Sequence, residues 1–139
     1  MSIQTDNSPA GSLTSDPPRE VFVFGSDLAG RHSSGDALTA LRDYGAIYGR
    51  AVGLQGRSYA IPVRDEDGKL LPIPVIARYV QAFLRFAATY RQITFLVTRI
   101  GTGRGAYCDE EIAPLFAGAP SNCRLPKPWQ RFLGGPKPK

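Results

Sequence analysis

Two apolar runs, each followed by a glycine-bearing turn, constrain the fold of this chain more than any other feature. Residues 21–24 lead into a turn at residues 25–35, and residues 93–98 lead into a turn at residues 100–107. A helix-like segment follows each turn, so each unit predicts a buried strand, a turn and a helix. Glycine lets backbone N–H groups approach an anion closely, and a helix N-terminus adds a favourable partial charge. The two units together predict a phosphate-binding domain.

The rest of the sequence continues this alternation of strands and helices. Apolar runs bounded by glycine, proline or polar turns predict strands at residues 21–24, 58–63, 93–100 and 122–125. Apolar stripes with helical spacing predict helices at residues 36–44 and 75–90, and the acidic cluster at 109–111 predicts the first turn of a short helix at 109–116. Residues 45–57 contain four glycines and are expected to form a loop. This order predicts an α/β fold with three layers, a mostly parallel sheet and helices on both faces.

Single positions refine these elements. Ser33 or Ser34 is the expected N-cap of the first helix, and Pro74 is expected at the first position of the second helix, where its missing N–H costs nothing. Residues 93–100 are apolar or β-branched on both faces except at Arg99. That pattern predicts a central strand covered by helices on both sides.

The composition fits one globular domain with a tail at each end. The chain has 139 residues, of which 42% are hydrophobic and 21% charged. We expect a disordered tail at residues 1–19, a domain at 20–125 and a basic tail at 126–139. No apolar run is long enough to span a membrane, and a cytoplasmic location is expected, which is the host cytoplasm if a phage encodes the chain. The two cysteines and the single histidine lack the spacing of a disulfide framework or a zinc site, so no metal or cofactor is expected.

Basic residues raise a second class of function, nucleic-acid binding. Residues 126–139 carry four basic residues and no acid, and residues 20–125 contain eleven arginines and one lysine. Arginine binds phosphate bidentately and stacks on bases, although a GC-rich genome also favours it. Trp129 and Phe132 lie among the basic residues of the tail, which is a pattern of stacking with phosphate contact. The alternative is that both aromatic residues pack the tail onto the domain.

The carboxyl edge of the predicted sheet is the expected ligand site, because both turns would emerge there if the two strands run parallel. Asp27 and His32 are candidate catalytic residues; the alternatives are that Asp27 caps the turn and that His32 is an exposed, inert loop residue. Arg104 is expected to contact phosphate or solvent, and Tyr107 to stack on a sugar or to pack. A further alternative is that the glycines only permit tight connections, as in an interaction domain without a ligand. The candidate ligand-binding residues are Ser26, Asp27, Gly30, Arg31, Ser34, Gly35, Gly101, Thr102, Gly103, Arg104, Gly105 and Tyr107.

The two motifs resemble those of the macro domain superfamily, most closely its compact phage and bacterial members. In that family a strand and an Asn lead into a glycine-rich loop and a helix, and a later strand leads into a G-x-G loop and an aromatic residue. The corresponding segments here are residues 23–38 and 97–107. The resemblance implies a macro-like fold that binds an ADP-ribose-like nucleotide, free, cyclic or conjugated. By position, Asp27 and residues 30–35 would contact the distal ribose, residues 101–105 the pyrophosphate, and Tyr107 the distal sugar.

The sequence departs from the family pattern where chemistry would be expected. Asp27 stands in place of the usual Asn, and residues 32–34 read His-Ser-Ser in place of a glycine triplet. Asp16 is the one candidate for the family's adenine-recognising Asp. The expectations are therefore binding with hydrolysis of an ADP-ribosyl bond, or a non-catalytic, phage-type protein that sequesters a nucleotide signal.

Overall fold

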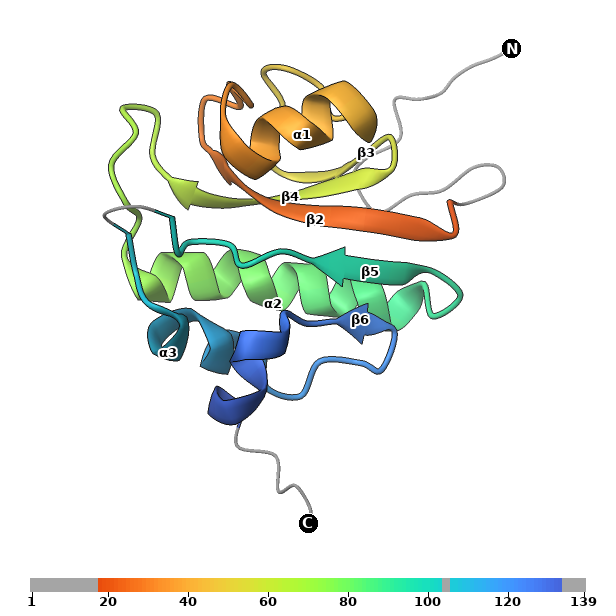
Figure 1. Ribbon diagram of the computed structural model, residues 1–139. Helices are drawn as coiled ribbons and strands as arrows, with labels where there is room; N and C mark the ends of the chain where they lie inside the picture. The colour runs from red at the N-terminus through yellow and green to blue at the C-terminus, as the bar shows by residue number, and fades with distance from the viewer. Residues whose placement is uncertain (1–17, 104–105, 134–139) are drawn as a thin grey trace.

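A five-stranded mixed sheet forms the centre of the computed structural model, which describes residues 18–103 and 106–133 (Figure 1). The strands lie in the order β3-β4-β2-β5-β6. Only β3 is antiparallel to its neighbour, and the other three pairings are parallel. The strands are β2 (Glu20–Asp27), β3 (Gly53–Gln55), β4 (Ser58–Arg64), β5 (Thr94–Val97) and β6 (Cys123–Arg124).

Helices pack on both faces of this sheet. Figure 1 shows α1 on one side and α2 with α3 on the other. The α/β fold with a mostly parallel sheet between helices, expected from the sequence, is therefore confirmed. The helices are α1 (Gly35–Asp43), α2 (Ile73–Thr89) and α3 (Asp109–Ile112), and two 3-10 helices are η1 (Ala113–Phe116) and η2 (Lys127–Phe132). None of the helices in the described ranges is both long enough and apolar enough to span a membrane.

The alternation of side chains along β2 explains why both faces of the sheet are covered. Val21 and Val23 belong to the core beneath α2, whereas Phe24 belongs to a smaller core that includes Ala40 of α1. Successive side chains of a strand point to opposite faces, so a continuous apolar run must be buried on both sides. The run 21–24 therefore needs a helix on each face, and α1 and α2 supply them.

Aromatic side chains fill the core between the sheet and α2. Phe83, fully buried on α2, lies 5.0 Å from the ring of Tyr59 on β4 and 5.3 Å from the ring of Phe95 on β5, between ring centroids. Its ring also lies 6.3 Å from that of Phe116. These edge-to-face ring pairs join α2, two strands and η1 into one packing unit.

The strands β2 and β3 differ from the sequence prediction. β2 continues past Gly25 to Asp27, and residues 45–57 include the strand β3 rather than a loop alone. At Gly25 a Cβ atom would lie 3.3 Å from Cγ2 of Val63, so this glycine allows close packing within the strand and does not end it. β3 has only three residues and depends on its antiparallel pairing with β4, which local composition does not reveal.

The strand β5 is shorter and less covered than expected. It ends at Val97, where the predicted strand continued to residue 100. Phe95 and Val97 are buried on one face, while Thr94 and Leu96 on the other face are half-buried. On that face α1 contacts the neighbouring strand β2. The prediction that helices cover both faces of this strand was therefore wrong for β5.

The packed structure extends past residue 125. Trp129 of η2 is fully buried, and its ring lies 5.0 Å from that of Phe116. The alternative in which Trp129 packs onto the domain is therefore confirmed, and the indole offers no face for base stacking. Residues 1–17 and 134–139, which include Asp16 and most of the expected tails, lie outside the described residues.

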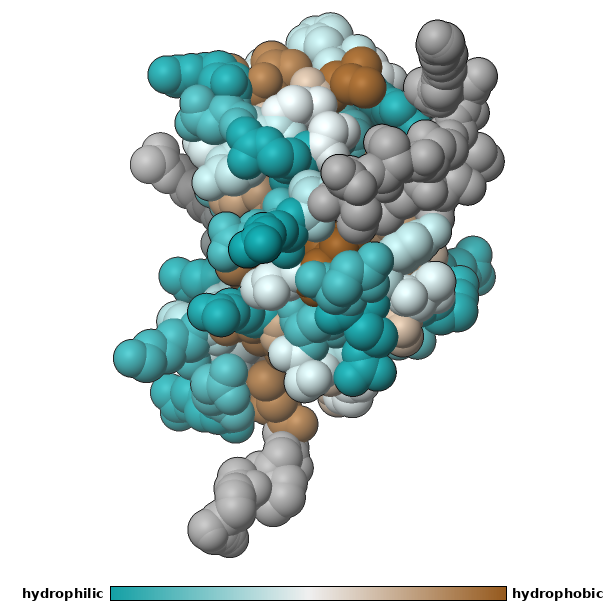
Figure 2. All heavy atoms as spheres, turned by 90° about the vertical axis from the view of Figure 1, so that its right-hand side faces the viewer, coloured by the Kyte–Doolittle hydropathy of each residue, from teal (hydrophilic) through white to brown (hydrophobic). Residues whose placement is uncertain are grey.

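The segment between α1 and β3 carries exposed apolar side chains. Ile47, Tyr48 and Val52 are 47%, 63% and 40% exposed. Figure 2 shows hydrophobic surface at the end of the molecule that carries α1, on an otherwise largely hydrophilic face. This segment covers the first glycine-bearing turn, as the hydrogen bonds below establish.

Phe83→Ala tests the central place of this ring in the core. Removing it is expected to lower the free energy of unfolding by about 3–5 kcal/mol, because the cavity meets three rings that cannot all collapse inward. Urea unfolding followed by circular dichroism measures the change. Gln81→Ala, at an exposed position of the same helix, is the control and should change stability by less than about 0.5 kcal/mol. Equal effects of the two variants would contradict this account of the core.

Candidate functional site

A hollow of about 360 Å³ lies at the carboxyl edge of the sheet, between the two glycine-bearing turns. Both turns reach this edge because β2 pairs in parallel with β5, as the sequence argument required. The hollow is lined from both sides, and no single turn forms it alone. Its lining residues are Gly25, Ser34, Gly35, Asp36, Ala37, Val63, Arg64, Leu70, Arg99, Ile100, Gly101, Gly103 and Ala106.

The N-terminus of α1 forms one wall of the hollow. Ser34 is the N-cap, as expected, but its side chain makes no capping hydrogen bond. Gly35 adopts φ +55°, and a Cβ atom there would meet nothing within 4 Å. The first N–H groups of a helix have no partner within the helix, and together they carry a partial positive charge. The N-terminal N–H groups of α1, with their partial positive charge, therefore lie at this wall of the hollow.

The second turn forms the opposite wall. Gly101 and Gly103 line the hollow, and a Cβ atom at Gly103 would meet nothing within 4 Å. The turn is held by a hydrogen bond from the Thr102 hydroxyl to the Arg99 carbonyl, 2.8 Å, and by one from the Tyr107 N–H to the Gly101 carbonyl, 3.0 Å. These two hydrogen bonds hold the glycine backbone of this wall in place. Arg104 and Gly105, both candidate ligand residues, lie outside the described residues.

Two arginines line the hollow that the sequence argument did not select. Arg64 ends β4, and its Nη1 donates to the Gly68 carbonyl at 2.8 Å. Arg99 makes a two-point contact with Asp109, Nε to Oδ1 at 3.1 Å and Nη2 to Oδ2 at 2.8 Å. Asp36, an exposed acid in the first turn of α1, is also in the lining. Arg64 is the last residue of β4, whereas Arg99 follows the end of β5 by two residues, so the signal that marks both arginines is their position where a strand leads into a turn.

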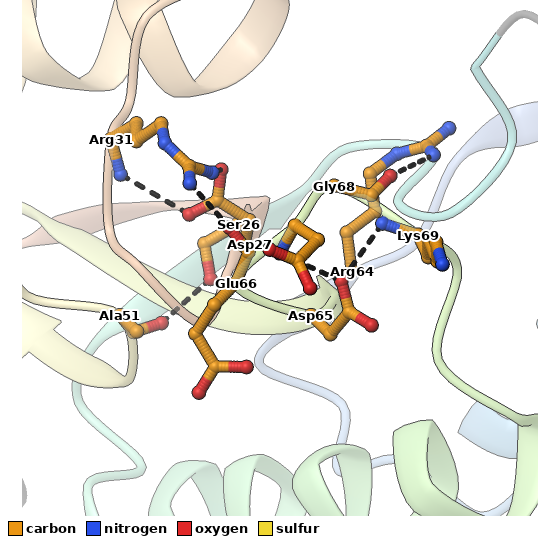
Figure 3. A network of polar contacts seen from close by, with 10 residues as sticks. Ser26, Asp27, Arg31, Ala51, Arg64, Asp65, Glu66, Gly68 and Lys69 are labelled. Atoms are coloured by element: carbon orange, nitrogen blue, oxygen red, sulfur yellow. Dashed lines mark hydrogen bonds and ion pairs between the residues drawn. The ribbon is translucent and has the colours of Figure 1, made fainter.

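Asp27 and Arg31 hold the first turn together instead of lining the hollow. Oδ2 of Asp27 lies 3.0 Å from Nη1 of Arg31, and Oδ1 accepts the Arg31 backbone N–H at 3.2 Å (Figure 3). Arg31 also donates to the carbonyl oxygen of Glu66, which ties the first turn to the polar turn after β4. The Asp27 carboxylate therefore caps its own turn, which was one of the two expectations for it.

His32 is buried, with only 2% of its surface exposed, so the expectation of an exposed loop residue was wrong. The residues that cover it come from the segment 45–57, which contributes the Arg50 carbonyl 2.9 Å from Nε2 and the Gln55 Oε1 3.3 Å from Nε2. Both partners are acceptors, so Nε2 carries the proton. The ring also meets Phe24 edge-on at 5.1 Å. His32 thus anchors the first turn from beneath.

Gly30 fits against the same segment. Its carbonyl accepts the Gly49 N–H at 2.6 Å, and a Cβ atom at Gly30 would lie 2.5 Å from the Gly49 carbonyl carbon. Ser26, 4% exposed, donates from its hydroxyl to the Ala51 carbonyl at 2.6 Å (Figure 3). These two candidate residues therefore support the wall of the hollow from outside it.

Tyr107 packs on the core beneath the sheet. Its hydroxyl donates to the Leu71 carbonyl at 2.8 Å, and its ring contacts the larger core. Of the ten candidate ligand residues that the structure describes, the hollow brings together Ser34, Gly35, Gly101 and Gly103.

The pKa values of both cysteine thiols are raised, and the described residues contain no cluster of metal-ligating side chains. Burial raises the pKa of the Cys123 thiol to about 11. The pKa of Cys108 is also raised, chiefly by the hydrogen bond from its Sγ to Glu111 Oε1, 3.2 Å. Within residues 18–103 and 106–133, no three His, Cys, Asp or Glu side chains cluster as metal ligands would.

A larger and more open hollow of about 850 Å³ lies at the opposite edge of the sheet. It is lined by Pro18, Arg19, Glu20, Arg57, Gln92 and Thr94. These residues include the starts of β2 and β5 and neither glycine-bearing turn. Ligands of parallel sheets bind at the carboxyl ends of strands, so the smaller hollow is the candidate site.

Comparison of this chain with known protein families, with curated proteins and with solved structures found no match. The site is accordingly interpreted from its geometry.

Alanine at Gly30 and at Gly35 separates steric contact from backbone conformation. Gly35→Ala is expected to cost about 1–2 kcal/mol of stability, because an L-residue is strained at positive φ but finds open space there. Gly30→Ala carries the same strain at φ +68° and also collides with the backbone of Gly49, so it is expected to cost clearly more. Urea unfolding of both variants measures the difference. Similar losses would contradict the close contact between the first turn and residues 49–50.

Asp109→Asn tests the ion pair at the rim of the hollow. The hydrogen bond from Arg99 holds the pKa of Asp109 below its usual value of 3.8. A carboxylate with a depressed pKa in the folded state adds stability at pH values above its unfolded pKa, and that stability is lost as the pH falls through the folded pKa. The stability difference between wild type and Asp109→Asn is therefore expected to be constant above about pH 4 to 5 and to shrink below it. Urea unfolding at a series of pH values, with Asp43→Asn as control, measures this; a difference that does not change with pH would contradict the pairing.

Proposed function

We propose that this chain binds an ADP-ribose-like nucleotide in the hollow between the two turns, without hydrolysing it. The observation that carries the proposal is that one hollow at the carboxyl edge of a parallel sheet is lined by both a helix N-terminus and a glycine-rich turn. Its volume of about 360 Å³ lies within the range of small-molecule sites. The phosphates would contact the backbone N–H groups of the Gly101 turn.

The charges around the hollow favour an anion that also carries hydroxyl groups. Arg64 and Arg99 contribute positive charge, and the α1 N-terminus adds its partial charge. Asp36 contributes a negative charge on the α1 side, where it repels phosphate but accepts hydrogen bonds from hydroxyls. A ligand with phosphates toward the Gly101 turn and sugar hydroxyls toward Asp36 satisfies both. A sugar nucleotide fits this arrangement better than inorganic phosphate does.

The resemblance of both motifs to macro domains supports ADP-ribose as the first ligand to test. Sequestering of a nucleotide signal is favoured over hydrolysis because neither Asp27 nor His32 lines the hollow. Asp27 is engaged by Arg31, and His32 is buried against Arg50 and Gln55. Neither residue is placed to activate a water on a ligand in the hollow.

Gly103→Val tests the site by filling it. Gly103 lines the hollow, a Cβ atom there meets nothing, and its φ lies outside the left-handed region, so a side chain is expected to leave the fold intact. The wild-type protein is expected to bind ADP-ribose in isothermal titration calorimetry, and Gly103→Val is expected to weaken that binding at least tenfold. Ala88→Val, which places the same valine side chain on the exposed face of α2, should bind ADP-ribose as the wild type does.

The outcomes of this titration are distinct. No heat with ADP-ribose, cyclic ADP-ribose or NAD would overturn the proposal. Binding that Gly103→Val leaves unchanged would move the ligand to another site. Product formation over long incubation would overturn the non-hydrolytic part and leave the binding part standing.

A further inference from the structure

Arg99 stands at the rim of the hollow in a fixed orientation. Its Nε and Nη2 atoms both donate to the carboxylate of Asp109, at 3.1 Å and 2.8 Å. The side chain of Arg99 is nevertheless 53% exposed, whereas that of Asp109 is 16% exposed. An exposed arginine would ordinarily sample many rotamers, and the two-point contact restricts it to one plane.

The carboxylate that fixes Arg99 is itself fixed by the C-terminal 3-10 helix. Oδ1 of Asp109 accepts the indole N–H of Trp129 at 2.8 Å. Trp129 is fully buried and packs against Phe116. A continuous series of contacts therefore runs from the core beneath the sheet, through Trp129 and Asp109, to the guanidinium at the hollow.

We infer that Arg99 is a phosphate-binding residue of this site and that Asp109 and Trp129 are positioning residues for it. A guanidinium has five N–H donors, of which Asp109 takes two, so three are left for ligand oxygens. Arg99 lines the hollow together with Gly101 of the second turn. Its orientation is set before a ligand arrives, which lowers the conformational entropy lost on binding. This inference rests on the proposed nucleotide binding.

The competing interpretation is that the Arg99–Asp109 pair only joins the second turn to α3. A merely structural pair would alter stability when broken and leave the affinity of a phosphate ligand unaffected in the folded protein. The two interpretations therefore differ in ligand affinity, in the effect of lysine, and in rescue by an external cation.

The experiment measures ADP-ribose affinity by calorimetry for the wild type, Arg99→Ala, Arg99→Lys and Trp129→Phe, with Arg91→Ala as an exposed control near the start of β5. Arg99→Ala is expected to bind ADP-ribose about tenfold to one hundredfold more weakly, because it loses charge-assisted hydrogen bonds to the ligand. Arg99→Lys keeps the charge but cannot contact Asp109 at two points, so most of the loss should remain. Trp129→Phe removes the N–H and keeps a ring, and is expected to weaken binding about twofold to tenfold.

Chemical rescue gives a readout that a structural role would not move. Guanidinium chloride at non-denaturing concentration is expected to restore part of the ADP-ribose affinity of Arg99→Ala, whereas sodium chloride at the same ionic strength is not. Circular dichroism and urea unfolding confirm that each variant is folded before titration. Because Arg99 is half-exposed, Arg99→Ala keeps the inference testable if Trp129→Phe does not fold.

Failure of the inference differs from failure of the proposed function. If the wild type binds ADP-ribose and Arg99→Ala binds equally well, Arg99 is not a phosphate ligand and the proposed function stands. If Arg99→Lys and Trp129→Phe both bind as the wild type does, the positioning role is overturned. If the wild type binds no nucleotide, the proposed function and this inference fall together.

Discussion

The parallel pairing of β2 with both β4 and β5 is the constraint on which the rest of the structure depends. Its four pairs with β5 and its longer ladder with β4 place the ends of all three strands at one edge. Val21 and Val23 then face α2 while Phe24 faces α1, so burial of a single run recruits a helix to each side. The two turns that follow β2 and β5 therefore both lie at this edge, and the hollow lies between them.

A second layer of support comes from a segment that looks unstructured in the sequence. The side chain of Gln55 accepts the Ile47 N–H at 2.8 Å and donates to the Arg50 carbonyl at 2.9 Å, which gives residues 47–55 a fixed shape. That shape receives His32 and Gly30 of the first turn. Most residues of the first turn are therefore engaged with protein, and the residues of this turn that line the hollow are Gly25 at its start and Ser34 and Gly35 at its end.

The fold was largely predictable because it follows from local patterns, whereas much of the site was not. Patterns in consecutive residues predict the apolar stripe of α2, the strand at 58–63 and the proline-limited helical segment before Phe116. The roles of Gly30 and His32 depend on residues about twenty positions away that no local pattern links to them. Asp27 was correctly located at the strand end, but its partner Arg31 decides whether its carboxylate is free. Sequence position thus located the edge, and packing determined which side chains reach the hollow.

Arg99 is a second residue whose role depends on packing and could not be predicted from the local sequence. In the sequence it interrupts an apolar run, and Trp129 stands among basic residues as if exposed. Asp109 connects them: it accepts from the buried indole on one side and from the half-exposed guanidinium on the other. A carboxylate with both partners is held more firmly than an exposed ion pair, whose net stabilisation is small because two long side chains must be ordered. Burial against Phe116 already orders the indole. The packing of the core therefore also orders Asp109 and, through it, Arg99. The 3-10 helix η2, which packs against α3 and η1, is therefore part of what shapes the rim of the hollow.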